Sequence, residues 1–150
     1  MDWQIKSFGQ LTTDELYDFL KLRIDVFVVE QTCYYPDLDE LDRHPQTLHV
    51  FCYENGKILG YLRILPKGTT YEQYNSIGRV IIAESARGTG LGHELVRVGI
   101  NACQTHFSEK TIKISAQQHL SNFYQQHQFK QVTEMYLEDG IPHIGMLLDK

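Results

Sequence analysis

Hydrophobic and polar positions repeat along most of the chain, and the length of the repeat changes from one segment to the next. Alternation with a period of two predicts strands, whereas apolar residues spaced three and four positions apart predict helices. Together the segments predict a β-α-βββ-α-β-α-ββ order. Strands are expected at residues 3–8, 48–53, 58–65, 74–82, 111–116, 131–137 and 143–148, and helices at residues 13–30, 91–106 and 120–127.

Turn and capping residues fix several boundaries between these elements. Thr12 is placed to cap the first helix, with Glu15 as its capping-box partner. Asn55-Gly56 suits the type I′ turn of a hairpin, and Asp139-Gly140 supplies a second turn. Residues 31–45 show no clear period, and a loop of this length in a compact domain is often functional.

The predicted order indicates a mixed α/β fold in one domain spanning residues 1–150. A helix links the strands at 74–82 and 111–116, so these two strands are expected to be parallel. The other neighbouring strands are expected to be mostly antiparallel, with helices covering both faces of the sheet. A chain of this length can bury a core without metals or disulfides.

Composition narrows the partners and the location. The formal net charge of −5 disfavours nucleic-acid binding. No apolar run approaches the ~20 residues that span a membrane, and the N-terminus does not resemble a signal peptide, so a cytoplasmic location is expected. The odd count of cysteines and the spacing of the histidines suggest neither a disulfide framework nor a metal site. Cys52 and Cys103 are expected in the core, and Cys33 in a loop.

The segment Arg87–Gly92 carries the most specific chemistry. It follows the apolar run Val80–Ile82 and precedes the helix expected at 91–106. A Gly-rich turn between a strand and a helix can hold phosphate, because its backbone N–H groups converge at the positive end of the helix dipole. The spacing fits neither a dinucleotide fingerprint nor a P-loop. The alternative to a phosphate-binding turn is an ordinary strand-to-helix turn with no ligand.

Arg87, Gly90 and Gly92 form an Arg-x-x-Gly-x-Gly pattern that resembles the pyrophosphate loop of the GNAT superfamily, the N-acetyltransferases that bind acetyl-CoA. The element order resembles that fold along almost the whole chain. Further segments resemble the ElaA-like branch of the superfamily. They are Phe27–Gln31 with the acidic loop after it, Ser115–Gln117, Phe123-Tyr124 and Tyr136–His143.

The resemblance implies that the two central parallel strands splay apart around acetyl-CoA. Backbone N–H groups of the Gly turn would hold the pyrophosphate. Residues 80–82 would pair with the pantetheine amides, and a backbone N–H of residues 78–82 would polarise the thioester carbonyl. The expected CoA-binding residues are Val80, Ile81, Ile82, Arg87, Gly88, Thr89, Gly90, Leu91, Gly92, His93, Gln117, Asn122 and Tyr124.

Tyr124 is the expected general acid, because the family often places a tyrosine after the second parallel strand with its hydroxyl near the sulfur. Its alternative role is simply to pack on the sheet. The chain departs from the family by lacking an Asn where that strand meets its helix, which leaves Gln117, His119 or Asn122 to contact CoA. Gln128 replaces a glycine and must either adopt a left-handed conformation or end the helix differently.

The general base is open among several residues. Glu30 and His143 are preferred, and His49 and Glu134 are alternatives. Acidic residues cluster at 37–42 and at 134–139. Such clusters usually belong to solvated loops, but at the edge of a cleft they would favour a cationic substrate such as an amine.

The sequence therefore predicts an N-acetyltransferase in which an amine attacks acetyl-CoA directly in a ternary complex. The expected partners are acetyl-CoA and an amine of a small molecule, peptide or protein, and the chain is expected to be a monomer or a homodimer. The rival prediction is a non-catalytic module that binds or senses acyl-CoA. A third is a plain interaction domain that binds no CoA.

Overall fold

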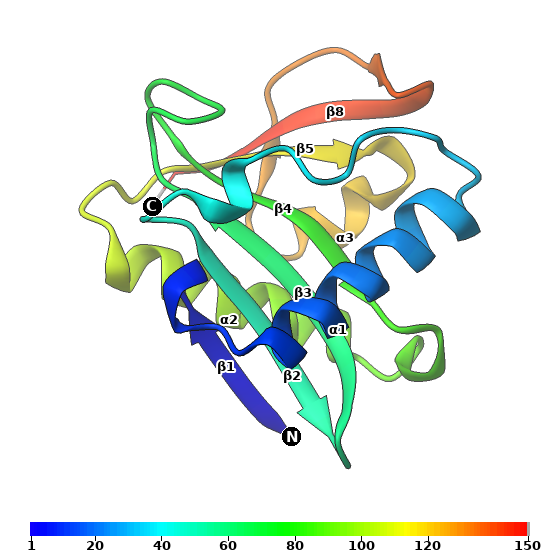
Figure 1. The fold of residues 1–150 in the computed structure, drawn as a ribbon. Coiled ribbons are helices and arrows are strands. Elements are labelled where there is room, and N and C mark those ends of the chain that lie inside the picture. Colours follow the sequence, from blue (N-terminus) through cyan, green and yellow to red (C-terminus); the bar gives the residue numbers. More distant parts are fainter. Residues whose placement is uncertain (150) are drawn as a thin grey trace.

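Eight strands pair into one mixed sheet in the computed structural model, which describes residues 1–149 (Figure 1). Their order across the sheet is β1-β2-β3-β4-β5-β8-β6, and β7 also pairs with β8. Only the β4–β5 pair is parallel within the described residues, as the sequence predicts. The strands are β1 Asp2–Lys6, β2 Leu48–Glu54, β3 Lys57–Leu65, β4 Asn75–Ile82, β5 Ile112–Gln117, β6 Lys130–Gln131, β7 Tyr136–Glu138 and β8 Ile141–Leu148.

Helices cover both faces of this sheet, which confirms the predicted fold class. Helix α1 (Thr13–Arg23) lies on one face, and α2 (Leu91–His106) and α3 (Ser121–Gln125) lie on the other (Figure 1). The predicted capping box at the start of α1 is present, because Glu15 N–H donates to Thr12 Oγ1 over 3.1 Å and Thr12 N–H donates to Glu15 Oε1 over 2.9 Å. The predicted helix at 13–30 changes to π-helical hydrogen bonding from Ile24 to Glu30.

Each face of the sheet has its own apolar core. Phe19 of α1 packs against Phe51 and Tyr61 on one face. On the other face Leu95 of α2 and Tyr124 of α3 pack with the inward side chains of the central strands. Cys52 and Cys103 are buried, as predicted, and all three cysteines are free thiols.

The prediction of one strand at 131–137 is wrong. The segment divides into β6 and β7, because the Thr133 hydroxyl accepts the N–H of Gly145 over 2.8 Å in place of a strand partner. The first strand is shorter than predicted and ends at Lys6, because a capped 3-10 turn begins at Phe8. The hairpin turn is confirmed, since Asn55 and Gly56 both have positive φ, at 52° and 74°.

The parallel strands separate soon after they pair. Their register covers only Asn75 with Ile112 and Ser76 with Lys113, although β4 continues to Ile82 and β5 to Gln117. The splay that the resemblance implies is therefore present. A bulge sits on the opened part of β4, where Arg79 (φ 52°) and Val80 face the single residue Leu62 of β3.

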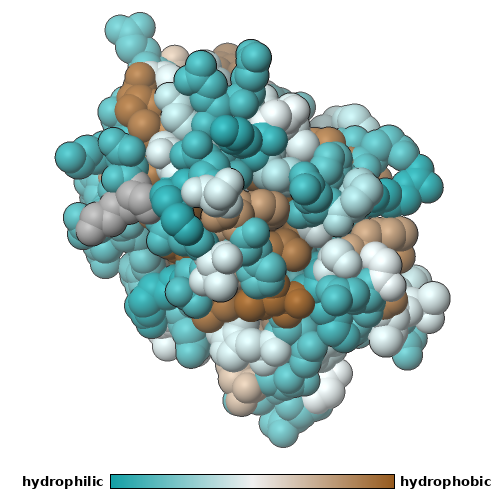
Figure 2. Space-filling model, turned by 90° about the vertical axis from the view of Figure 1, so that its left-hand side faces the viewer, coloured by the Kyte–Doolittle hydropathy of each residue, from teal (hydrophilic) through white to brown (hydrophobic). Residues whose placement is uncertain are grey.

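Most of the face shown in Figure 2 is hydrophilic. Seen from the left side of Figure 1, hydrophobic side chains reach the surface mainly in a small central area (Figure 2). No helix within residues 1–149 is long and apolar enough to cross a membrane.

Candidate active site

A cavity of about 400 Å³ opens where β4 and β5 separate. Its walls include Ser76–Val80 of β4, Ile114–Gln117 of β5 and Tyr124 of α3. Successive residues of a strand point to opposite faces of a sheet. Because neighbouring residues of β5 all line the cavity, it connects the α3 side of the sheet with the α1 side.

Tyr124 enters this cavity from the α3 side. Its side chain is only 7% exposed and packs edge-on against Phe123 and Phe129, with ring centroids 5.1 and 5.9 Å away. No residue in the described part of the chain hydrogen-bonds to its hydroxyl. Burial raises the pKa of Tyr124, so the phenol stays protonated at neutral pH. The hydroxyl is thus a proton donor facing the cavity without a protein partner.

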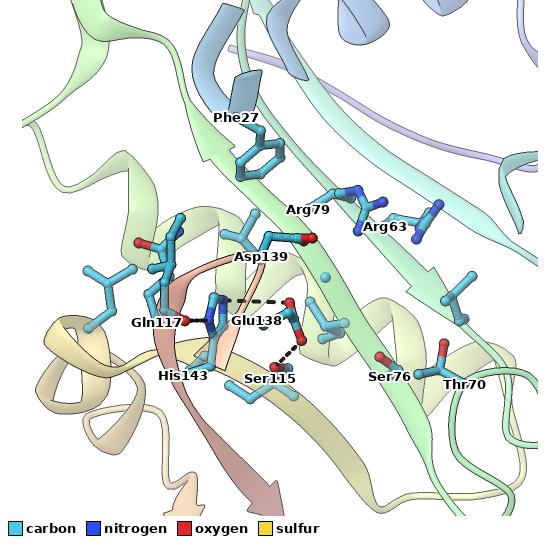
Figure 3. A pocket seen from close by; sticks show the side chains of 18 of the residues that line it. Phe27, Arg63, Thr70, Ser76, Arg79, Ser115, Gln117, Glu138, Asp139 and His143 are labelled. Carbon is cyan, nitrogen blue, oxygen red and sulfur yellow. Dashed lines mark hydrogen bonds and ion pairs between the residues drawn. The ribbon is translucent and has the colours of Figure 1, made fainter. Parts of the chain in front are cut away.

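His143 lies in the same cavity, on the α1 side, at the centre of a polar network (Figure 3). Its Nδ1 is 2.7 Å from the carbonyl of Ile141, which assigns the ring proton to Nδ1 and leaves the lone pair on Nε2. Nε2 is 3.6 Å from Glu138 Oε2, and Glu138 Oε1 accepts the Ser115 hydroxyl over 2.9 Å. Ser115 Oγ is also 2.5 Å from the hydroxyl of Tyr136.

The sequence reasoning missed this network, although Ser115, Tyr136 and Glu138 all fall in the segments that carry the family resemblance. A second signal was available from the pairing of strands. The polar face of 115–117 and the acidic hairpin after 136 become neighbours once β5 and β8 pair in register, with Gln117 opposite His143.

The other proposed bases are occupied or distant from the cavity. Glu30 forms a two-pronged ion pair with Arg87, at 2.7 and 2.9 Å, and does not line the cavity. The hydrogen bond from Arg87 holds the pKa of Glu30 below its usual value, which weakens it as a base. His49 is fully buried between Tyr61 Oη and the Asp42 carbonyl, and burial lowers its pKa to about 4. Glu134 also lies outside the lining residues.

The Gly turn has the geometry of an anion site. Gly88 and Gly90 have φ of 77° and 85°, which glycine adopts without strain. Gly90 caps α2, and no backbone N–H from Gly88 to His93 donates to an acceptor in residues 1–149. The turn lies outside the cavity, but Gly92 abuts Phe123, the neighbour of Tyr124. His93 uses its ring elsewhere, with Nδ1 2.9 Å from Nε2 of His127.

The remaining expected CoA contacts are divided between the cavity and its surroundings. Val80 and Gln117 line the cavity. Ile81 is buried in the core beneath α1, Ile82 packs beside the core on the other face, and Asn122 is exposed outside the cavity. Gln128 adopts a left-handed conformation, with φ of 73°, in place of the family's glycine.

Two acidic residues of the loop, Asp37 and Asp42, are buried, contrary to the expectation that such clusters are solvated. Both pair with Arg23, with nitrogen–oxygen distances of 2.8 and 2.7 Å. Arg63 and Arg79 bind the same loop from β3 and β4, through Asp39 and Asp37. The missed signal was Arg23 itself, since an arginine on the apolar face of a helix needs buried acidic partners.

Comparison with known proteins places the chain in a family. Residues 18–150 match the model of the acetyltransferase (GNAT) domain. The chain belongs to the GNAT family. This GNAT protein is 42% identical over 146 residues to protein ElaA of Escherichia coli strain K12, which covers 97% of this chain and 95% of ElaA.

Solved structures support the same assignment. The crystal structure of E. coli ElaA gives a TM-score of 0.91 at 41% identity and covers 97% of each chain. An acyl-CoA N-acyltransferase from Pseudomonas aeruginosa gives a TM-score of 0.91 at 43% identity, covering 98% of this chain and 99% of that one. An aminoglycoside 6′-N-acetyltransferase complexed with coenzyme A shares the fold alone, with a TM-score of 0.71 at 16% identity.

Proposed function

We propose that this GNAT protein transfers an acetyl group from acetyl-CoA to a primary amine by direct attack in a ternary complex. The observation that carries the proposal is the cavity between β4 and β5. One unpartnered phenol, Tyr124, faces it from the α3 side, and an imidazole lone pair, His143 Nε2, faces it from the α1 side. These groups have the chemistry to donate and accept the two protons that move during transfer.

Acetyl-CoA would enter from the side of α2 and α3. The backbone amides from Gly88 to His93 would bind its pyrophosphate at the start of α2, since they have no other acceptor in the described residues. The pantetheine would run along Val80–Ile82. The bulge at Arg79 and Val80 leaves a residue of β4 out of the ladder, and a backbone N–H of this bulge would stabilise the oxyanion. One such preorganised donor contributes about 3 kcal/mol to the transition state.

The acceptor amine would bind on the α1 side as a cation and lose a proton to His143 Nε2. Its nitrogen then attacks the thioester carbon, and the C–S bond breaks as Tyr124 donates its proton to the departing thiolate. The second proton leaves the nitrogen as the amide forms and restores the Tyr124 phenol, and the His143 imidazolium releases its proton to water. The Glu138 carboxylate, 3.6 Å from Nε2, would stabilise the imidazolium formed in the first step. Of the two bases preferred from the sequence, His143 is the one that lines the cavity.

Three single substitutions test these roles. Tyr124→Phe and His143→Gln are expected to lower kcat by about 10²-fold or more with little change in CoA affinity. Glu30→Gln should keep kcat within a few-fold of the wild type. The measurements are steady-state rates on a panel of primary amines with acetyl-CoA and calorimetric titration with CoA. A wild-type rate in Tyr124→Phe and His143→Gln would refute the assigned roles.

The same experiment separates the rival functions. CoA binding without turnover on any amine would support an acyl-CoA-sensing module. An interaction domain would bind no CoA, and CoA would then leave the thermal transition unchanged. A specific ligand at 100 times its dissociation constant adds about 2.7 kcal/mol of stability.

A further inference from the structure

The acceptor side of the cavity has one acidic wall. Glu138 ends β7 and Asp139 begins the turn to β8, and both line the cavity. The Asp139 carboxylate forms no ion pair within residues 1–149. Glu138 has His143 as its neighbour, and that ring is neutral while it serves as a base. This wall attracts a cationic amine to the position from which His143 accepts a proton.

Just behind the opposite wall lies a hydrogen-bond donor that lacks an acceptor, because Arg63 lines the cavity while its Nε is closed off from solvent. Arg63 on β3 is 3% exposed, and its Nη1 and Nη2 bind Asp39 at 2.8 and 2.9 Å. Its Nε is the one buried side-chain nitrogen or oxygen in residues 1–149 that has no hydrogen-bond partner. An unsatisfied buried donor is costly, so such a group is normally paired in the functional state. Thr70 and Ser76 add hydroxyls at this end of the cavity (Figure 3).

The two walls are far apart on the same face of the sheet. Arg63 is on β3 and His143 on β8, with β4 and β5 between them. At the usual strand spacing their Cα atoms are at least about 14 Å apart. Both side chains line the cavity that lies between them. The amine and a carboxylate oxygen of an α-amino acid are under about 4 Å apart, too close to serve both walls.

We propose that the acceptor is a small elongated molecule with a primary amine at one end and a carboxylate or carboxamide oxygen several bonds away. The amine lies against Glu138 and His143, and the Arg63 side chain shifts so that its Nε donates to the oxygen. The cavity, about 400 Å³ in volume, lies at the small end of ligand sites. Part of its lining, called the roof here, is formed by Cys33, Tyr35 and Asp39 of the loop between α1 and β2, and the buried pairs of Arg23 with Asp37 and Asp42 hold this loop in place. This inference rests on the proposed function and specifies its substrate.

A panel of matched amines tests the inference on the unaltered protein. The measured quantity is kcat/KM with acetyl-CoA for pentylamine, 5-aminopentanamide, 5-aminopentanoate, ethylamine and glycinamide. We expect 5-aminopentanamide or 5-aminopentanoate to exceed pentylamine by about 10-fold to 100-fold, because one buried hydrogen bond to a charged group is gained. Glycinamide, which is too short, should gain nothing over ethylamine.

Arg63→Lys tests the donor directly, since lysine keeps the positive charge near Asp39 but has no Nε–H. The ratio between 5-aminopentanamide and pentylamine should fall to about one, and Arg43→Lys, an exposed change outside the cavity, should keep the wild-type ratio. Thermal unfolding and CoA titration verify that both variants fold. If Arg63→Lys does not fold, the amine panel on the wild type decides.

The outcomes separate this inference from the proposed function. Turnover of pentylamine and its oxygen-bearing analogues with equal kcat/KM would overturn the inference and leave the acetyltransferase assignment intact. A lysine-containing peptide that outperforms every small amine tenfold would overturn the choice of a small molecule. No turnover with any amine would instead count against the proposed function itself.

Discussion

Replacing Asp42 by Asn should destabilise the protein far more than an ordinary surface change. Asp42 Oδ1 lies 2.7 Å from Arg23 Nη1 and 3.1 Å from Arg63 Nη1, and Oδ2 lies 3.2 Å from Arg23 Nη2. Arg23 is fully buried and Arg63 nearly so. Asparagine keeps the size of the side chain but removes its negative charge. The two buried arginines, Arg23 and Arg63, then lose one of the carboxylates that balance their positive charges.

The expected loss is about 3–5 kcal/mol of the free energy of unfolding, the range for breaking a buried ion pair from one side. In a domain of this size each 1 kcal/mol shifts Tm by about 2–4 °C, so the transition should fall by about 6–20 °C. Asp25→Asn is the matched control, because Asp25 pairs with Lys21 on the exposed face of the helix. That change should cost under about 0.5 kcal/mol.

Urea unfolding of the wild type and both variants at pH 7 and at pH 3 measures these losses. Burial alone would raise the pKa of Asp42, but the hydrogen bonds and charges of Arg23 and Arg63 outweigh it and hold the pKa below its usual value. The stabilisation by Asp42 is therefore present above the ordinary carboxyl pKa and is lost as pH falls through the lowered one. A deficit at pH 7 below about 1 kcal/mol, or no larger than that of Asp25→Asn, would refute the reasoning.

Two further substitutions have equally definite outcomes. Gly90→Ala should lower the free energy of unfolding by about 1 kcal/mol and weaken CoA binding, because alanine resists a φ of 85°. Urea unfolding and CoA titration measure both effects, and Gly9→Ala, whose added Cβ meets no atom within 4 Å, is the control. His49 is buried and neutral with its pKa lowered to about 4, so the unfolded chain binds the proton more readily and stability falls as pH drops from about 6.5 toward 4. His49→Gln should remove about 2–3 kcal/mol of that pH dependence in urea unfolding at pH 7, 5.5 and 4.5, and unchanged pH dependence would contradict the assignment.

Local sequence patterns predicted most helices and strands of this fold. They did not predict where a strand is divided or where a helix changes its hydrogen bonding. The helical spacing of apolar residues in α2 and the Asn-Gly turn are both encoded by residues that are close in sequence. Both elements are found where expected. The division at 132–135 depends on Thr133 meeting Gly145 on another strand, which no local pattern encodes. The change to π-helical hydrogen bonding after Arg23 is likewise not visible in the spacing of the apolar residues.

In the candidate site, too, the features encoded by neighbouring residues were predicted, and those that depend on distant segments were not. The Gly turn was recognisable because its spacing is local, and Tyr124 followed from the family resemblance. The choice between Glu30 and His143 could not be made from the sequence, because the Glu30–Arg87 pair and the Ser115–Glu138 bond join distant segments. Asp37 and Asp42 were mistaken for solvated residues for the same reason, since their partner Arg23 lies on α1.

Ion pairs between three arginines and three aspartates hold the roof over the acceptor end. The arginines are Arg23, Arg63 and Arg79, and the aspartates are Asp37, Asp39 and Asp42. Most of these groups are shielded from water, so dissolved ions screen them weakly. Glu138 and Asp139 are exposed to water, so dissolved ions screen them effectively. Raising the ionic strength should thus leave the roof closed and its melting behaviour intact while raising the KM for a cationic amine.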